Sequence, residues 1–218
     1  MRNKKNFLVV LVLVLGITAC ATTGDSASGS TSGKETIVCL GDSITAGYGA
    51  TVVGKDDKSK SWPAFLQNKV NIPVINAGVS GDTTAQGLAR VKRDVLSKNP
   101  RIVIIGLGGN DLFQRIPLVT TKNNLQKIID MVNDGNRKIY LVDSFPDVNE
   151  YNEQYHIMYN TLASSNNIEL IVDEFDGVNG IRNYMSDELH PNAKGYEIMA
   201  ENFFNVLKPY LEANNLLK

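Results

Sequence analysis

A serine follows directly after the first apolar run of the folded part of the sequence. Residues 36–40 (TIVCL) are apolar or β-branched, and the loop Gly41-Asp42-Ser43-Ile44-Thr45 comes next. Ligands of open α/β sheets lie beyond the carboxyl ends of the strands, so a hydroxyl at this position stands where chemistry can happen. Serine is also a preferred helix N-cap residue. On its own, the tripeptide Gly-Asp-Ser therefore fits a nucleophile and a helix cap equally well.

A serine nucleophile needs a general base, and the sequence contains only His156 and His190. His156 falls in a helical stretch, where we expect a surface or packing residue. His190 stands in the polar loop 186–192 (SDELHPN), with Asp187 three residues earlier. This spacing lets the Asp187 carboxylate reach the imidazole Nδ1 and leave Nε2 toward Ser43. The same loop is also compatible with an ordinary cap and a histidine that merely precedes a proline.

Acyl transfer further requires hydrogen-bond donors aimed at the developing oxyanion. Gly81 follows the second predicted strand and Asn110 follows the third. The backbone N–H groups of Ser43 and Gly81 and the side-chain amide of Asn110 could provide three such donors. Glycine suits this role because its backbone can approach a substrate closely. Each residue also has an ordinary explanation, a turn for Gly81 and a helix cap or Asx-turn for Asn110.

These residues need a scaffold that brings the strand ends together, and alternating strand and helix patterns predict one. Strands are expected at 36–40, 74–78, 101–107, 139–142 and 168–172. Helices are expected to begin near residues 61 and 83 and to include residues 125–132 and 155–162. A last helix is expected at 196–211. The pattern from 83 runs up to Asn99-Pro100. This alternation predicts a three-layer α/β fold with a five-stranded parallel sheet and helices on both faces. Right-handed crossovers favour a flavodoxin-like strand order, in which Ser43, Gly81 and Asn110 become neighbours.

The N-terminus has the features of a targeting segment rather than of the fold. Basic residues among the first five positions precede an apolar stretch at 7–17, which ends in Ile17-Thr18-Ala19-Cys20. The apolar stretch is shorter than the about 20 residues that a membrane span requires. Its ending resembles the bacterial lipobox, so we expect residues 1–19 to be a lipoprotein signal peptide and Cys20 to be lipidated. Plain secretion and a retained anchor are the alternatives.

The remaining chain divides into a tether and one domain. Residues 20–33 are predicted to form a flexible tether, because the residues after Cys20 are nearly all Ala, Gly, Ser and Thr. Residues 34–218 are of single-domain size. The expected location is the bacterial cell envelope, outside the cytoplasm, with the membrane bound through the lipid on Cys20. Lipidation would leave Cys39 as the only cysteine of the domain, a small buried hydrophobe without a disulfide partner.

The charge balance argues against nucleic acid as a partner. The chain has 22 basic and 23 acidic residues, and without Arg2, Lys4 and Lys5 the balance is 19 against 23, a net charge of −4. A mildly acidic domain without a basic cluster does not have the electrostatic footprint of a nucleic-acid-binding protein. The loop after the first strand also lacks a phosphate-binding pattern such as Gly-x-Gly-x-x-Gly, which disfavours a flavodoxin-like nucleotide or flavin binder.

Four segments of the domain resemble, in order and spacing, the four blocks of the SGNH hydrolase (GDSL esterase/lipase) family. They are Gly-Asp-Ser at 41–43, the stretch 76–83 (NAGVSGDT), Gly-Gly-Asn-Asp at 108–111, and Asp-x-x-His-Pro-Asn at 187–192. The stretch 80–90 (SGDTTAQGLAR) is most similar to the bacterial branch that contains acyl-CoA thioesterase I/lysophospholipase L1 and related arylesterases. Residues 112–120 and 147–154 depart from the family pattern, which leaves the substrate preference open.

The resemblance implies a role for each matching residue. Ser43 would be the nucleophile, His190 the base and Asp187 its orienting partner, while Ser43, Gly81 and Asn110 would form the oxyanion hole. The implied activity is hydrolysis of carboxylic esters such as lysophospholipids, short or medium acyl esters, aryl esters or thioesters, with no cofactor or metal. A carbohydrate O-deacetylase of the same family and a non-catalytic surface binding lipoprotein are the alternatives.

Overall fold

The computed structural model describes residues 35–143, 145, 149 and 152–218. The predicted signal peptide, the lipidation site Cys20 and the tether lie outside these residues. The described residues belong to one compact unit. Within them, no helix combines the length and the apolar character that crossing a membrane demands.

A five-stranded parallel sheet forms the centre of the domain. Its strands are β1 (Thr36–Gly41), β2 (Val74–Gly78), β3 (Pro100–Gly106), β4 (Lys138–Val142) and β5 (Glu169–Ile171), and their spatial order is β2-β1-β3-β4-β5. Every residue of β1 is buried, because helices cover both faces of the sheet. The predicted fold class and the flavodoxin-like order are confirmed.

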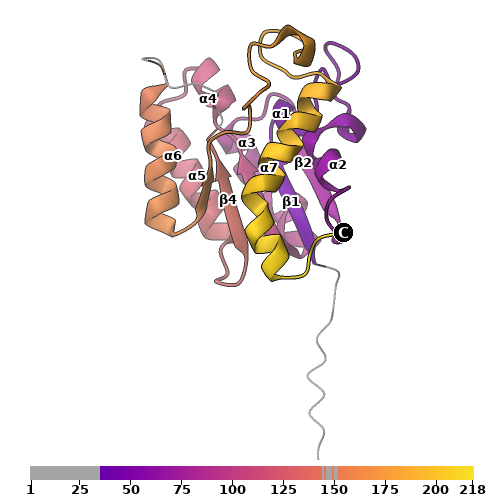
Figure 1. Ribbon diagram of the computed structural model, residues 1–218. Coiled ribbons are helices and arrows are strands. Elements are labelled where there is room, and N and C mark those ends of the chain that lie inside the picture. Colours follow the sequence, from indigo (N-terminus) through magenta and orange to yellow (C-terminus); the bar gives the residue numbers. More distant parts are fainter. Residues whose placement is uncertain (1–34, 144, 146–148, 150–151) are drawn as a thin grey trace, which may run out of the picture. The chain divides into compact units, whose positions relative to one another are not determined.

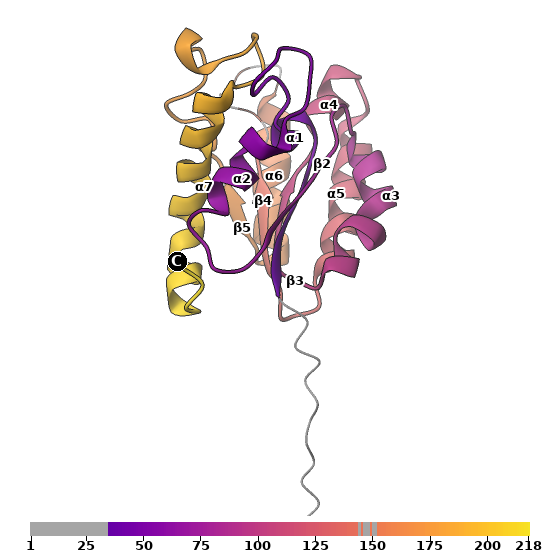
Figure 2. The ribbon, with the colours of Figure 1, turned by 90° about the vertical axis from the view of Figure 1, so that its right-hand side faces the viewer.

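Two groups of helices cover the two faces of the sheet. Figure 2 shows α2 (Trp62–Leu66) and α7 (Ala193–Ala213) on one side and α3 (Thr84–Asp94) and α5 (Leu118–Val132) on the other. The apolar residues of α6 (Glu153–Asn166) pack into the same cluster as those of α3 and α5. The apolar residues of α2 and α7 form the second cluster, against the opposite face. Figure 1 shows α7 running along the whole height of the sheet.

The strands that carry the candidate site end in glycine at the same level. Gly41 of β1 is in register with Gly78 of β2 and with Gly106 of β3. A Cβ atom at Gly78 would lie 2.9 Å from the Cα atom of Ala46. Only glycine therefore lets the helix that follows β1 pass so close to β2. This close approach sets the serine next to the loop that follows β2.

Some helices end or begin at other residues than predicted, because the local backbone conformation sets these boundaries. The helix predicted up to Asn99 ends as α3 at Asp94, and a separate 3-10 turn follows over Leu96–Lys98. Asn99 takes a left-handed conformation with φ 50°, which ends the turn before β3. Helical spacing of apolar residues continues through this turn, so the pattern alone did not reveal the break. The short helix α4 (Gly109–Phe113) was not predicted.

Candidate active site

Ser43 lies at the carboxyl end of β1, as the first residue of the short helix α1 (Ser43–Ala46). The Asp42 carboxylate accepts a hydrogen bond from the Ile44 backbone N–H at 3.1 Å, which makes Asp42 the N-cap. The alternative in which Ser43 caps this helix is therefore wrong. Because its neighbour provides the cap, the Ser43 hydroxyl is available for contacts outside the helix.

His190 reaches Ser43 from the loop that precedes α7. Its Nε2 atom lies 3.0 Å from Ser43 Oγ. The ring of Tyr48 packs against the imidazole, with 4.4 Å between the ring centroids. The Tyr48 carbonyl oxygen in turn accepts a hydrogen bond from the hydroxyl of the buried Tyr196 at 2.9 Å. These contacts connect the imidazole to α7 and position it at the end of β1.

Asp187 holds the other side of the imidazole. Both of its carboxylate oxygens lie 3.0 Å from His190 Nδ1. The carboxylate also accepts the backbone N–H groups of Leu189 at 2.8 Å and of His190 at 2.7 Å. Partial burial raises the pKa of Asp187, but these hydrogen bonds outweigh it and hold the pKa below its ordinary value. An ionised Asp187 favours a proton on Nδ1, which leaves Nε2 as the acceptor for the Ser43 hydroxyl proton.

The amide of Asn110 lies between two acceptors beside Ser43. Its Nδ2 atom donates to the Asp82 carbonyl oxygen at 3.0 Å and to Asp42 Oδ2 at 3.3 Å. Both Ser43 and Asn110 line the same cavity. The longer of the two bonds is the weaker one, so it is the bond that a substrate oxygen would replace most easily.

Gly81 lies in the loop between β2 and α3, one residue before the Asp82 carbonyl that binds Asn110. Its φ of 84° favours glycine, and a Cβ atom at this position would meet nothing within 4 Å. Within the part of the chain that the structure describes, the backbone N–H groups of Ser43 and Gly81 donate to no acceptor. Among the described residues, no acceptor competes with a substrate oxygen for these two N–H groups.

A buried arginine joins the strand ends beneath the site. Arg90 of α3 donates to the Asp82 carboxylate at 2.6 Å, to the Ala77 carbonyl at 2.6 Å and to the Gly41 carbonyl at 2.9 Å. Arg90 and Asp82 are both buried. The three bonds fix the ends of β1 and β2 relative to the loop that holds Gly81. No role was predicted for Arg90, although it belongs to the stretch 80–90 that carried the family resemblance.

Asp111 also holds the backbone near the site in place, on the other side of Asn110. Its carboxylate accepts the Thr84 backbone N–H at 2.8 Å and the Thr84 and Thr121 hydroxyls at 2.5 and 3.1 Å. Asp111 is fully buried. These bonds connect the start of α4 to α3 and α5, so the Asn110 backbone is held from two directions. In the sequence, Asp111 is the last residue of the Gly-Gly-Asn-Asp segment, but the sequence analysis predicts no role for it.

The buried carboxyl of Asp42 completes the electrostatics of the site. Burial raises its pKa to about 7, and the negative charges of Asp82 and Asp111 add to this, while the Ile44 hydrogen bond opposes it. A carboxyl in this range titrates close to neutral pH. Asp42 therefore adds less negative charge beside Ser43 than an ordinary aspartate would.

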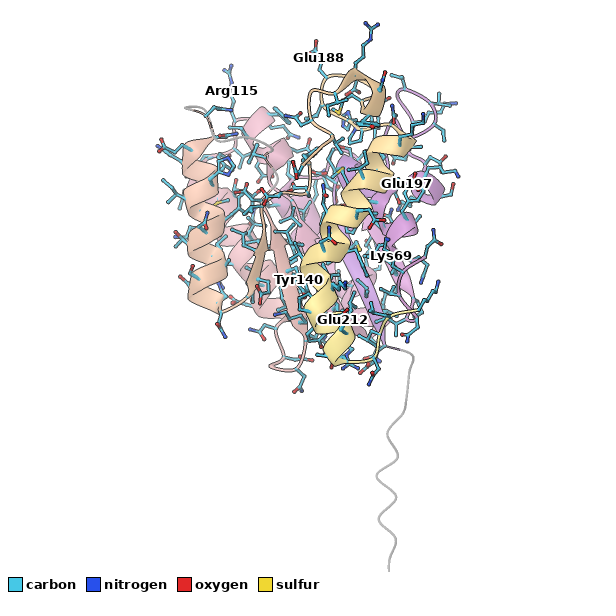
Figure 3. The ribbon with its side chains drawn as sticks, in the orientation of Figure 1. Lys69, Arg115, Tyr140, Glu188, Glu197 and Glu212 are labelled. Carbon is cyan, nitrogen blue, oxygen red and sulfur yellow. The ribbon has the colours of Figure 1, made fainter. Side chains whose placement is uncertain are left out.

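A cavity of about 300 Å³ opens next to Ser43. Ser43, Ile44 and Asn110 line it together with the aromatic side chains of Trp62, Phe113, Phe145, Phe175 and Phe203. Glu188 and Leu189, beside Asp187, also belong to its lining. Figure 3 shows Glu188 and Arg115 at this end of the domain, opposite Glu212. A cavity of this size and apolar character accommodates a small organic group.

The second histidine has a carboxylate partner of its own. His156 Nδ1 lies 2.5 Å from Asp143 Oδ2, just after the end of β4. The His156 side chain is 13% exposed, and its ring lies 6.0 Å from that of Phe145. His156 is thus a largely buried residue paired with Asp143, which fits the expected packing role and not a surface position. His190, and not His156, is the histidine in contact with Ser43.

Comparisons with known proteins show which family the sequence belongs to. Residues 39–198 match the GDSL-like lipase/acylhydrolase family. "Thioesterase 1/protease 1/lysophospholipase L1" of Escherichia coli strain K12 is 32% identical over 181 residues, which cover 80% of this chain and 84% of that protein. "Arylesterase" of Vibrio mimicus is 30% identical over 183 residues, with coverage of 80% and 88%.

A solved structure supports the same assignment. The crystal structure of TesA superposes with a TM-score of 0.69 at 29% sequence identity, covering 80% of this chain and 99% of that one. The family match spans most of the described domain and includes the segments of Ser43, Asn110 and His190. The chain thus belongs to the GDSL-like lipase/acylhydrolase family.

Proposed function

We propose that the protein is a serine esterase that hydrolyses carboxylic esters through an acyl-enzyme on Ser43. One observation carries the proposal: Ser43 Oγ, His190 and the Asp187 carboxylate form a continuous chain of 3.0 Å contacts at the edge of an apolar cavity. This arrangement supplies a nucleophile, a base and a partner that orients the base. Membership of a family of lipases and acylhydrolases supports the same chemistry.

In the first half-reaction, Ser43 Oγ attacks the ester carbonyl carbon while His190 Nε2 accepts the hydroxyl proton. The negative charge that develops on the carbonyl oxygen is stabilised by the N–H groups of Ser43 and Gly81 and by the Asn110 amide. The C–O bond to the leaving alcohol then breaks, and His190 returns its proton to that oxygen. Asp187 stabilises the imidazolium throughout.

In the second half-reaction, water attacks the acyl-enzyme by the same route. His190 removes a proton from the water molecule, and the oxyanion forms among the same three donors. Breakage of the bond to Ser43 Oγ releases the carboxylic acid and restores the hydroxyl with the proton from His190. No step in this sequence needs a metal or a cofactor.

The cavity supports acyl groups larger than acetyl. The cavity has a volume of about 300 Å³ and an aromatic lining, so an apolar acyl chain can bury its surface there. An acetyl group is too small to fill most of this volume. This favours short to medium acyl esters, aryl esters or lysophospholipids over the acetyl groups that a carbohydrate O-deacetylase removes. Relatives named for arylesterase, thioesterase and lysophospholipase activities agree with such substrates.

For the location of the enzyme, we propose a lipid anchor on Cys20 and a site outside the cytoplasm. The proposal is supported by the charged, apolar and small-residue sequence of 1–19 and by the polar stretch that follows. Mass spectrometry of the cell-derived protein should reveal a diacylglyceryl-modified Cys20 as the first residue. A mature N-terminus downstream of Cys20 would contradict it.

The esterase proposal is tested with p-nitrophenyl acetate, butyrate and octanoate. We expect the wild-type protein to hydrolyse butyrate and octanoate esters faster than acetate, and the Ser43→Ala variant to lose activity by several orders of magnitude. Ser164→Ala, which changes an exposed serine of α6, is the matched control and should retain wild-type rates. Substantial turnover by Ser43→Ala would refute the assignment, and an acetate preference would favour the deacetylase.

A further inference from the structure

Tyr48 contacts the His190 imidazole in a way that neither Ser43 nor Asp187 does. Ser43 Oγ and the Asp187 carboxylate contact the two ring nitrogens, at Nε2 and Nδ1. These two contacts still allow the imidazole to turn about the line that joins the nitrogens. The Tyr48 ring packs against the imidazole, with 4.4 Å between the centroids and an angle of 46° between the planes. Tyr48 thus limits the rotation that the two polar contacts leave open.

The backbone of Tyr48 is bonded to the candidate nucleophile and to α7. The Tyr48 N–H donates to the Ser43 carbonyl oxygen at 3.1 Å. The Tyr48 carbonyl oxygen accepts a hydrogen bond from the Tyr196 hydroxyl at 2.9 Å, and the Ala50 carbonyl oxygen accepts one from the Ala193 N–H at 2.8 Å. Ala193 and Tyr196 belong to the first turn of α7, directly after the loop that carries the base. Tyr48 therefore connects the residue of the nucleophile to the helix that follows the base.

Two glycines on either side of Tyr48 fix the direction of its side chain. Gly47 and Gly49 have φ angles of 78° and 77°, in the left-handed region that favours glycine. A Cβ atom at Gly47 would lie 2.6 Å from the Asp57 carbonyl oxygen, and one at Gly49 would lie 2.6 Å from Ser186 Oγ. The turn is therefore packed tightly against the start of the loop that carries the base.

Tyr48 acts on the base and not on the substrate. It is not among the described residues that line the cavity next to Ser43. In the proposed reaction, the imidazole becomes positively charged when it accepts the Ser43 proton. A cation is attracted to an aromatic ring within about 6 Å of the ring centroid. The 4.4 Å separation from the Tyr48 ring lies within this range.

We propose that Tyr48 is a positioning residue for His190, whose ring holds the neutral imidazole toward Ser43 and attracts the imidazolium that forms during catalysis. This inference rests on the proposed esterase function and adds a residue to its machinery. Because the attraction grows as the positive charge develops, it stabilises the transition state more than the bound substrate. Loss of the ring should therefore lower kcat and leave KM almost unchanged.

Two substitutions at Tyr48 test the role of the aromatic ring. With p-nitrophenyl butyrate, Tyr48→Leu should reduce kcat by about tenfold and change KM by less than about twofold. Tyr48→Phe keeps the ring and should retain kcat within about twofold of the wild-type value. Each rate is divided by the concentration of sites that a fluorophosphonate labels at completion, so that unfolded protein does not count as lost activity.

The rate of fluorophosphonate labelling gives a second measurement on the same variants. It should fall in Tyr48→Leu by about the same factor as kcat, because His190 activates Ser43 in both reactions. Tyr210→Leu is the matched control, since Tyr210 is a partly exposed tyrosine near the far end of α7. This variant should keep wild-type kcat and labelling rate per competent site. If Tyr48→Leu does not fold, Tyr48→Met, which also lacks a ring, takes its place.

Three results would overturn the proposal. Wild-type kcat per labelled site in Tyr48→Leu would show that His190 needs no aromatic neighbour. Equal losses in Tyr48→Phe and Tyr48→Leu would assign the effect to the hydroxyl, and a higher KM with unchanged kcat would identify a residue that binds substrate. Failure of the esterase proposal has a different signature, because wild-type protein would then hydrolyse no ester and Ser43 would remain unlabelled.

Discussion

His190 Nε2 lies 3.0 Å from Ser43 Oγ, although 147 positions separate the two residues in the chain. The contact joins the end of the first strand to the loop before the last helix. The protein therefore assembles its predicted nucleophile and base only when the sheet and α7 have packed together. The predictions below follow from this contact and from the groups that hold it in place.

Asp187 orients His190 through two 3.0 Å contacts to Nδ1. The Asp187→Asn substitution keeps the shape but removes the negative charge, so the imidazole loses both its tautomer preference and the stabilisation of its protonated form. We expect kcat for p-nitrophenyl butyrate to fall by up to about 10⁴-fold with a smaller change in KM. Asp173→Asn, at an exposed position, is the control. Near-normal kcat in Asp187→Asn would show that His190 acts without this partner.

Asn110 is predicted to donate to the oxyanion in the transition state. Asn110→Ala should reduce kcat by about 10²- to 10³-fold, a loss of about 2.7–4 kcal/mol of transition-state stabilisation. Steady-state kinetics with p-nitrophenyl butyrate measures this loss. Asn160→Ala, on the exposed surface of α6, should change kcat by less than about twofold. A reduction well below tenfold in Asn110→Ala would remove the amide from this role.

Arg90 is predicted to stabilise the fold from below the site. Arg90→Met leaves the buried Asp82 carboxylate without its partner and two carbonyl groups without a donor. We expect the free energy of unfolding, measured in urea, to fall by about 3–5 kcal/mol. Arg93→Met is the matched control on the same helix, because the Arg93 side chain is 76% exposed and should contribute little. Equal stability losses in the two variants would contradict the prediction.

Asp42 makes stability depend on pH. Burial, assisted by Asp82 and Asp111, raises its pKa from 3.8 to about 7. Between these values the folded protein holds a proton that the unfolded chain has released, so the Asp42 contribution to stability is lost as pH rises through this range. Asp42→Asn keeps an acceptor for the Ile44 N–H and removes the titration.

Urea denaturation at pH 5 and pH 7.5 measures this effect. Relative to wild type, Asp42→Asn should gain on the order of 1–3 kcal/mol of stability between the two pH values. Asp57→Asn is the control, because the Asp57 pKa is lowered and the group is ionised in both states above pH 5. Parallel pH profiles for wild type and Asp42→Asn would show that Asp42 has an ordinary pKa.

The sheet and most helices could be predicted because they depend on local patterns. Continuous β-branched and apolar runs such as 36–40 indicate strands buried on both faces, and the alternation with helices predicts parallel order. Asp187 and His190 could be paired because they lie three positions apart in one loop. The partnership of Ser43 with His190 followed from the order of the four sequence blocks and not from any local signal.

The remaining features depend on tertiary contacts that no local pattern encodes. Asp42, and not Ser43, caps α1, because the cap depends on which side chain turns back toward the Ile44 N–H. The bonds of Arg90 to two strand ends join residues from three elements.

The central claim, that Ser43 is the nucleophile activated by His190, is tested most directly by covalent labelling. Wild-type protein, Ser43→Ala and His190→Ala are treated with a fluorophosphonate, and adducts are located by intact-mass and peptide mass spectrometry. We predict one adduct per wild-type chain, on the peptide containing Ser43, with no adduct in Ser43→Ala and greatly slowed labelling in His190→Ala. An adduct on another residue, or an unlabelled Ser43 in a protein that hydrolyses esters, would contradict the claim.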